Sequence, residues 1–229
     1  MMTIENIHGR ETLKNLIDFK FPLSAIIIEH KSKLAENARD YLKNDFYNPP
    51  SFKELIDGKK IPVHFVENHN DEDTKNFLKK YSPDYIILGN TRILKEHIIS
   101  TAKKGVLNSH PAILPQYRGL DCVGWSILNR DSVGATVHMV DPGIDSGPII
   151  IQEIINFDDC NSLLAVRVKV MRKCAILFLK SLIGLEFGTL YPKIQESSLA
   201  KKYPSLPLEK INIVEEKISK QFDSKNSLK

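Results

Sequence analysis

Three polar residues near the middle of the chain have side chains that together could move an acyl group. Asn108 and His110 are two positions apart, and Asp145 follows in a glycine-rich loop. An amide can donate to a developing oxyanion, an imidazole can move a proton near neutral pH, and a carboxylate can orient or charge that imidazole. The set therefore predicts acyl-transfer chemistry, with Asp141 as the competing carboxylate.

The elements that must position these residues are indicated by the hydrophobic pattern. Short apolar runs rich in β-branched residues predict strands at residues 25–29, 61–66, 84–88, 106–108, 134–140 and 148–155. Helix-length segments lie at residues 32–44, 71–81, 93–103, 123–129, 162–184 and 208–222. This alternation is typical of an α/β fold with a mostly parallel sheet and helices on both faces. Asn108 and His110 would then lie at the carboxyl edge, where such sheets bind ligands.

The two ends of the chain fit this pattern less well. Residues 3–9 form only a weak strand and are not followed by a G-x-G-x-x-G loop. After residue 188, several prolines predict a loop or hairpin before the last helix, and residues 223–229 are expected to be disordered. We therefore predict a catalytic domain over residues 1–188 and a short extension over residues 189–229.

Composition excludes several classes of protein. The three cysteines form no C-x-x-C pair, which argues against a disulfide scaffold or a zinc ribbon. The net charge is +4, but residues 197–229 hold seven lysines against four acids, so the main body is nearly neutral and nucleic-acid binding is not expected. No apolar stretch approaches the roughly 20 residues that span a bilayer. We expect a soluble, cytoplasmic protein that binds no membrane.

The segment from Val106 to Gly147 resembles the folate-dependent formyltransferase family. Four runs of the family's pattern are present: Asn-x-His-Pro at residues 108–111, Leu-Pro-x-Tyr at 114–117, Gly-x-Thr-x-His at 134–138 and Asp-x-x-x-Asp-x-Gly at 141–147. Thr91-Arg92-Ile93-Leu94 looks like the family's folate-contacting segment. The resemblance implies a Rossmann-like fold, N10-formyltetrahydrofolate as co-substrate, and catalysis by Asn108, His110 and Asp145.

The resemblance also implies which residues contact the folate and how the reaction runs. The expected contacts are Gly89, Arg92, Ile93, Leu94, Val140, Asp141, Gly143 and Ile144. An unprotonated amine would attack the formyl carbon, with Asn108 and a protonated His110 stabilising the tetrahedral oxyanion and Asp145 holding His110 charged. Neither a metal nor a covalent enzyme intermediate is expected, since Cys122 has no evident activator.

Several other polar residues are interpreted as structural. His64, His69, Asp71 and Asp73 mimic metal ligands, but they straddle a strand end and a helix start, where such residues are common. His138 alternates with apolar neighbours on a predicted strand, and we interpret it as a supporting, inward-facing residue.

Three branches of the family act on different acceptor amines, and sequence features distinguish between them. Gly9-Arg10-Glu11-Thr12 departs from the phosphate loop of the glycinamide ribonucleotide enzymes, and only about 45 residues follow the long helix, where the methionyl-tRNA enzymes carry a further barrel domain. Tyr117-Arg118-Gly119 is the form seen in the tRNA and sugar branches. The preferred acceptor is therefore a nucleotide-linked amino sugar, such as a dTDP-4-amino- or 3-amino-6-deoxy sugar for surface polysaccharide.

The predicted acceptor contacts are Tyr117, Arg118 and Trp125. Arg118 could instead cap a helix or pair with Asp121, and Trp125 could simply pack the helix at residues 123–129. A formate-releasing hydrolase and a non-catalytic folate- or nucleotide-binding module are the remaining alternatives. The resemblance leaves a homodimer open.

Overall fold

A seven-stranded mixed sheet forms the centre of the computed structural model, which describes residues 1–33 and 47–226. The strands are β1 (Met2–Ile4), β2 (Ile26–Glu29), β3 (Val63–Val66), β4 (Tyr85–Gly89), β5 (Gly105–His110), β7 (Gly134–Met139) and β8 (Ile149–Ile154), in the order β3-β2-β1-β4-β5-β7-β8. The first five are parallel, whereas β7 is antiparallel to both β5 and β8. This Rossmann-like α/β arrangement confirms the predicted fold class.

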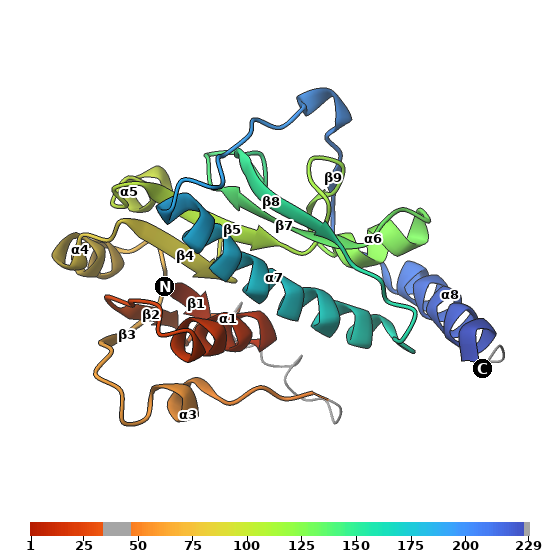
Figure 1. The fold of residues 1–229 in the computed structure, drawn as a ribbon, viewed down its shortest axis with the longest axis horizontal. Coiled ribbons are helices and arrows are strands. Elements are labelled where there is room, and N and C mark those ends of the chain that lie inside the picture. Colours follow the sequence, from red (N-terminus) through yellow and green to blue (C-terminus); the bar gives the residue numbers. More distant parts are fainter. Residues whose placement is uncertain (34–46, 227–229) are drawn as a thin grey trace.

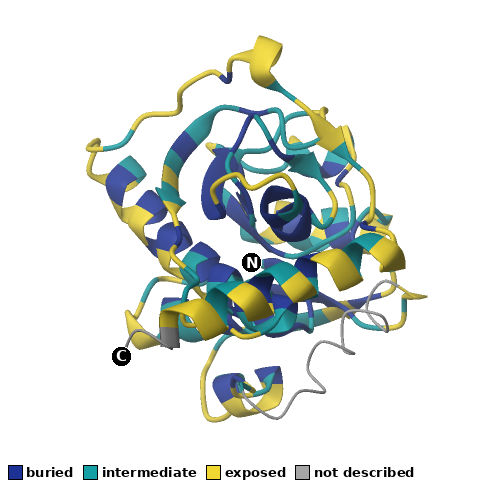
Figure 2. Cartoon of the chain, turned by 90° about the vertical axis from the view of Figure 1, so that its right-hand side faces the viewer, coloured by how far each residue is buried: buried dark blue, intermediate teal, exposed yellow. Residues whose placement is uncertain are grey.

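Helices cover both faces of the sheet (Figure 1). On one face lie α1 (Ile7–Asp18), α3 (Phe52–Ile56) and the long α7 (Leu163–Glu186), which packs beside α1. On the other face, α4 (Glu72–Tyr81) and α5 (Glu96–Ile99) close a second apolar core. Figure 2 shows the exposed stripes that alternate with buried ones along the outer helices, as expected for amphipathic segments.

The six predicted strands are all present, each within two residues of its expected ends. Of the predicted helices, residues 71–81 and 162–184 are confirmed. Their N-caps are Asp71, which accepts from the Thr74 N–H at 2.7 Å, and Ser162, which accepts from the Ala165 N–H. Residues 123–129 are confirmed as α6 (Cys122–Leu128). The predicted helix over residues 32–44 falls largely outside the described residues.

The prediction for the N-terminal segment was incomplete. Only Met2–Ile4 is strand, and Ile7 to Asp18 forms helix α1, whose first turn is capped by the Asn6 side chain accepting from the Gly9 N–H at 2.7 Å. A Cβ on Gly9 would lie 2.4 Å from Thr3 Oγ1 and 2.8 Å from the Ile4 carbonyl oxygen. Glycine is therefore needed because the helix turns back tightly against the strand that precedes it.

The predicted helix over residues 93–103 was wrong for most of its length, because α5 spans only Glu96–Ile99. The Asn70 side chain accepts from the Lys95 N–H at 2.7 Å and donates to the Ile93 carbonyl at 3.0 Å. These bonds hold residues 91–95 as an extended loop, since the groups concerned are unavailable for a helical ladder.

The C-terminal segment shares the core of the preceding domain. After α7 the chain forms β9 (Lys202–Tyr203), which pairs with β6 (Arg118–Gly119), and then α8 (Leu208–Asn226), whose Val214 and Ile218 are buried in the main apolar cluster. The predicted helix over residues 208–222 is thus confirmed, and it extends to Asn226. The prediction of disorder from residue 223 onwards was wrong for residues 223–226, which belong to α8. Residues 227–229 lie outside the described residues.

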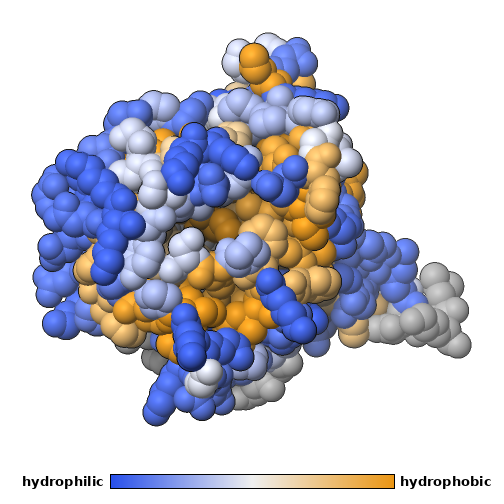
Figure 3. Space-filling model, turned by 60° about the vertical axis from the view of Figure 1, so that its left-hand side comes forward, coloured by the Kyte–Doolittle hydropathy of each residue, from blue (hydrophilic) through white to orange (hydrophobic). Residues whose placement is uncertain are grey.

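The surface mixes hydrophilic side chains with local apolar hollows. Figure 3 shows such a hollow on one face, ringed by hydrophilic residues. Within residues 1–33 and 47–226, no helix combines the length and apolar character that crossing a membrane requires.

Candidate active site

Asn108 and His138 face each other across the antiparallel pair β5 and β7. The register places them directly opposite, so their side chains emerge on the same face of the sheet. Asn108 Nδ2 lies 3.2 Å from His138 Nε2, and His138 Nδ1 lies 2.7 Å from the Met139 carbonyl oxygen. Since a carbonyl only accepts, His138 carries its proton on Nδ1, and Nε2 is left to accept from the Asn108 amide.

Asp145 reaches the same place from the loop between β7 and β8. Its Oδ2 accepts from the Gly119 N–H at 2.9 Å, and its backbone carbonyl accepts from the Gln195 side chain, also at 2.9 Å. Asp145 adopts a left-handed conformation with φ of 49°, which costs a non-glycine residue energy and is here fixed by these contacts. The loop is therefore held in place before any substrate binds.

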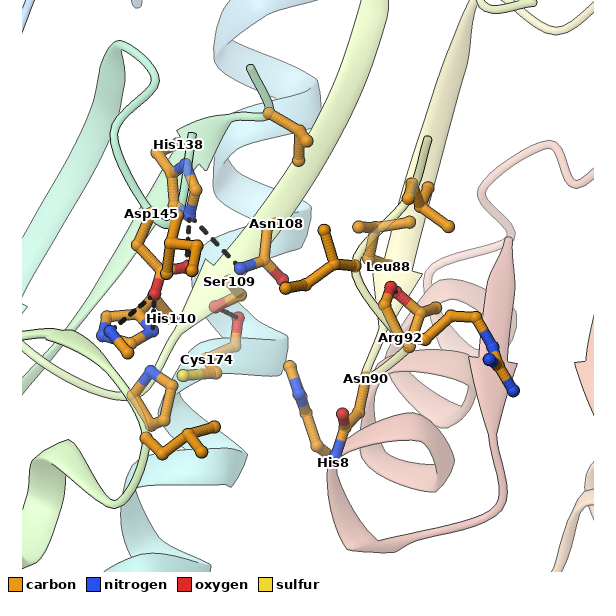
Figure 4. Close-up of a pocket in the computed structure, with 18 of the residues that line it drawn as sticks. His8, Leu88, Asn90, Arg92, Asn108, Ser109, His110, His138, Asp145 and Cys174 are labelled. Carbon is orange, nitrogen blue, oxygen red and sulfur yellow. Dashed lines mark hydrogen bonds and ion pairs between the residues drawn. The ribbon is translucent and has the colours of Figure 1, made fainter. Parts of the chain in front are cut away.

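His110, at the end of β5, completes the group. Its Nε2 lies 2.7 Å from the Tyr117 carbonyl oxygen and must donate to it, whereas Nδ1 lies 3.6 Å from Asp145 Oδ2. His138 Nε2 is also 3.6 Å from Asp145 Oδ1. Asn108, His110, His138 and Asp145 thus form one contiguous polar surface, which we term the strand wall (Figure 4).

The charge states in the strand wall follow from burial and neighbours. Burial lowers the pKa of His110, and the attraction of Asp145 only partly opposes this. Burial works against the Asp145 carboxylate too, but His110, His138 and the Gly119 N–H outweigh it and lower the pKa of Asp145 to about 2. In this structure, near pH 7, a neutral imidazole therefore faces a carboxylate, in contrast to the predicted protonated His110.

A cavity of about 720 Å³ opens beside the strand wall and contains most of the predicted site. The predicted residues that line it are Asn108, His110, Asp145, Arg92, Ile93, Leu94, Val140, Asp141, Gly143 and Ile144. Gly89 does not line the cavity. Its carbonyl oxygen accepts from Thr3 Oγ1 at 2.6 Å, and a Cβ on residue 89 would lie only 2.8 Å from Thr3 Oγ1. Gly89 allows β4 to approach β1 and α1 closely.

The loop at residues 91–95 offers backbone groups to the cavity. Its outer side is anchored by Arg92, whose guanidinium bonds both oxygens of the fully buried Glu29 at 2.6 and 2.8 Å, and by Asn70. Among the described residues, the N–H groups of Arg92, Ile93 and Leu94 and the Leu94 carbonyl find no hydrogen-bond partner. Together with apolar Leu88, Val140 and Ile144, they fit a flat heteroaromatic ring with donors and acceptors along one edge.

Residues from two helices also line the cavity. His8 from α1 and Met171 and Cys174 from α7 form this set, which we term the helix wall. Figure 4 shows His8 beside Asn90 and Cys174 beside Ser109 of β5. No motif marks these residues in the sequence, because they come from segments that meet only when α1 packs against α7. His138 was recognised only as a supporting residue, because its partnership with Asn108 depends on the antiparallel register of β5 and β7.

The three predicted acceptor contacts do not line the cavity. Tyr117 stacks on Tyr203 and donates to Asp131, and the Trp125 indole donates to the Pro204 carbonyl at 2.8 Å. The Arg118 guanidinium bonds Gln195 Oε1 at 2.7 and 3.2 Å, rather than capping a helix or pairing with Asp121. These bonds join β6 to the C-terminal segment, and contact with the acceptor remains a prediction.

The residues that mimicked metal ligands have structural contacts. His64 stacks on Phe77 and bonds the Tyr81 hydroxyl at 2.9 Å, and the His69 N–H donates to Glu29 at 2.9 Å. In the described part of the chain no group of three or more His, Cys, Asp or Glu side chains is placed to hold a metal ion. Burial raises the pKa of Cys122 to about 12, so this thiol stays protonated near neutral pH.

A family model described as formyl transferase matches residues 28–179 of this chain. The chain belongs to the formyl transferase family. Within it, the methionyl-tRNA formyltransferase of Prochlorococcus marinus is 28% identical over 210 residues, covering 90% of this chain and 59% of the relative. The chain spans about half the length of the curated relatives it matches.

Solved structures of the family share the fold. An N-formyltransferase from Helicobacter canadensis, in complex with folinic acid and dTDP-3-aminofucose, has a TM-score of 0.65 at 18% identity, covering 99% of this chain and 81% of that one. Glycinamide ribonucleotide transformylase 1 from Symbiobacterium toebii has a TM-score of 0.62 at 16% identity, covering 85% of this chain and 92% of that one. At these identities the likeness concerns the fold.

Proposed function

We propose that this formyl transferase family member transfers the formyl group of N10-formyltetrahydrofolate to the primary amine of a nucleotide-linked amino sugar. The observation that carries the proposal is the meeting of Asn108, His110 and Asp145 at one cavity, whose adjoining loop offers unpartnered backbone groups at Arg92 to Leu94. The first feature supports acyl transfer, and the second supports binding of a pterin.

The strand wall supplies the groups that this reaction needs. Asn108 Nδ2 has two hydrogens, of which His138 accepts one, so the second can donate to the oxygen that becomes negative as the amine attacks the formyl carbon. His110 Nδ1 carries the lone pair, because Nε2 donates to Tyr117, and it can accept the proton that the amine loses. The resulting imidazolium would be stabilised by Asp145 at 3.6 Å.

His110 can then return the same proton to N10 of the folate as the bond between N10 and the formyl carbon breaks. The amine thus exchanges one hydrogen for the formyl group, and the folate leaves as tetrahydrofolate. Asp145 remains ionised throughout, because its pKa is lowered to about 2. The strand wall therefore carries the proton from the amine to N10 and donates a hydrogen bond to the oxyanion. No covalent bond to the enzyme forms.

The acceptor is inferred from what surrounds the cavity. At the N-terminus of α1, the Asn6 side chain already accepts from the Gly9 N–H, and the Glu5 carboxylate bonds Arg10 at 2.7 Å. Glu11, in the second turn, is buried. Carboxylates on either side of the first turn disfavour a phosphate monoester there, which argues against glycinamide ribonucleotide. Lys202 of β9 lines the cavity elsewhere and could meet a diphosphate.

The acceptor assignment is tested by offering N10-formyltetrahydrofolate with three amines in separate reactions. These are a dTDP-linked amino sugar, glycinamide ribonucleotide and methionyl-tRNA, the last suggested by the names of the curated relatives. We expect a formamide only on the nucleotide sugar, and none with the Asp145→Asn variant. Formylation of glycinamide ribonucleotide or methionyl-tRNA with no turnover of any nucleotide-linked amino sugar would refute the proposed acceptor.

A further inference from the structure

Gln195 is a buried amide in an otherwise exposed stretch of the segment that follows α7. It is 8% exposed, whereas Ile194 before it is 91% exposed and Glu196 after it is also exposed. The stretch lies against the sheet, because Lys193 and Ile149 exchange backbone hydrogen bonds of 2.7 and 2.8 Å. An inward glutamine beside an outward isoleucine is the reverse of the usual preference. The position of Gln195 therefore depends on its hydrogen bonds.

All four hydrogen-bonding positions of this amide are filled. Gln195 Nε2 donates to the carbonyl oxygens of Asp145 and Gly147 at 2.9 and 2.7 Å. Gln195 Oε1 accepts twice from the Arg118 guanidinium, at 2.7 and 3.2 Å. The opposite orientation of the amide is excluded, because a carbonyl cannot donate and a guanidinium cannot accept. Gln195 thus has one fixed orientation, and its polar atoms are used within the protein.

The amide connects two supports of Asp145. Gly119 donates its N–H to Asp145 Oδ2 at 2.9 Å, and it follows Arg118 directly in β6. Gln195 bonds the backbone of the same aspartate, and Arg118 links Gln195 back to β6. The carboxylate and the backbone of Asp145 are therefore attached to the same strand, which makes its placement depend on the segment after α7.

Asp145 needs such support. Its φ of 49° lies in the left-handed region, which a non-glycine residue leaves unless its surroundings hold it there. In this conformation Asp145 Oδ2 lies 3.6 Å from His110 Nδ1 (Figure 4). If the backbone relaxed, the carboxylate would move away from the imidazole. A displacement of about 1 Å in a catalytic group can lower a rate by about 10²-fold.

We propose that Gln195 is a positioning residue for formyl transfer, which holds Asp145 where it stabilises the His110 imidazolium. The inference rests on the proposed function, and it adds that the segment after α7 is needed for the chemistry. Gln195 does not line the cavity, so it acts through Asp145 and not on a substrate.

The variant Gln195→Glu separates the bonds to Asp145 and Gly147 from those to Arg118. The two side chains have the same shape, and a carboxylate still accepts from Arg118, which keeps it ionised. It cannot donate to the two carbonyls. With the full chain and whichever amine the wild type formylates, we expect kcat to fall at least about 10-fold, with the KM for the acceptor within about twofold. The rates are measured well below the unfolding midpoint.

Two further variants complete the series. Gln195→Met has a similar shape without polar atoms and should show the same loss of kcat, so it carries the test if Gln195→Glu does not fold. Glu196→Gln makes the opposite exchange at the next, exposed residue and is the matched control. Its kcat should stay within about twofold of the wild type.

The Gly119 amide proton shows directly whether Asp145 is in place, because this N–H donates to Asp145 Oδ2. Its exchange with solvent is followed by NMR in the ligand-free protein. We expect exchange at least about 10-fold faster in both Gln195 variants and unchanged exchange in Glu196→Gln. A substitution that merely loosened packing elsewhere would leave the Gly119 signal as it is.

Either of two results would overturn the role of Gln195 and leave the proposed function standing. One is a kcat within about twofold of the wild type in both Gln195 variants. The other is a lower kcat with unchanged exchange at Gly119. If the wild type formylated none of the three amines, the proposed function would fail and the role of Gln195 in formyl transfer with it, whereas the Gly119 exchange would still show whether Gln195 holds Asp145.

Discussion

The strand wall and the helix wall of the cavity differ in how their polar groups are satisfied. In the strand wall, Asn108, His110 and Asp145 each already contact a group fixed by the fold. In the helix wall, His8 has no partner among the described residues. Groups that must act in a transition state gain from being preorganised. The contrast therefore favours the strand wall as the part of the cavity that performs the chemistry.

Loss of a strand-wall group should have the largest effect of any single substitution. Asn108→Ala, His110→Ala and Asp145→Asn should each lower kcat by at least about 10²-fold while the thermal unfolding midpoint shifts little, because each removes one preorganised polar group. Asp141→Asn, in the same loop as Asp145, is the control and should lose much less. Near wild-type turnover of His110→Ala would mean that the strand wall does not carry the chemistry.

The pH dependence of turnover tests the charge states of the strand wall. Since burial lowers the pKa of His110, its proton-accepting form is present at neutral pH and is lost only as the pH falls through that lowered value. The acceptor amine must also be unprotonated, so kcat/KM should fall on the acid side. Asp145→Asn removes the charge that favours the imidazolium, and its acid limb should lie no higher than that of the wild type. Activity that rises towards acid pH would contradict a neutral His110.

A substitution in the loop at residues 91–95 should have a smaller effect than one in the strand wall, and the effect should be on folate binding. Arg92→Met leaves the buried Glu29 carboxylate without its main partner, so we expect a several-fold higher KM for the folate with kcat nearly unchanged. It should also lower the free energy of unfolding by about 3 kcal/mol. Lys95→Ala, in the same loop but exposed, is the control. A KM change confined to the acceptor would place the folate elsewhere.

The smallest expected effect is that of chelators. The described part of the chain holds no cluster of metal-ligating side chains, and His110 and Asn108 can perform the transfer by proton movement and hydrogen bonding alone. Turnover after dialysis against EDTA should equal that before. A loss of activity that added zinc restores would show that a metal takes part.

The strand wall was largely predictable from the sequence, and the helix wall was not. Asn108, His110 and Asp145 belong to one stretch of motifs, and the strand preceding Asn108 is marked by its own apolar residues. His8 belongs to a helix whose start follows Met2–Ile4 too closely for a pattern to separate the two, and Cys174 reaches the cavity only through the packing of α7 on α1. The neutral state of His110 likewise depends on burial, which no local pattern records.

The surroundings of Tyr117, Arg118 and Trp125 could not be predicted from the sequence either. Arg118 lies in β6 and Trp125 in α6, and both side chains bond the C-terminal segment. Contact of these residues with the acceptor stays a prediction. Pairing with residues as distant as Gln195 and Pro204 depends on the path of the whole chain.

Direct formyl transfer by the strand wall can be tested by following the formyl carbon itself. Isotopically labelled N10-formyltetrahydrofolate is mixed with wild-type protein and a dTDP-linked amino sugar, and the label is observed by NMR. We expect the label to appear in the amide of the sugar at the same rate as tetrahydrofolate forms, and Asp145→Asn to abolish the transfer. Release of the label as formate, at the same rate with and without the amino sugar, would contradict it.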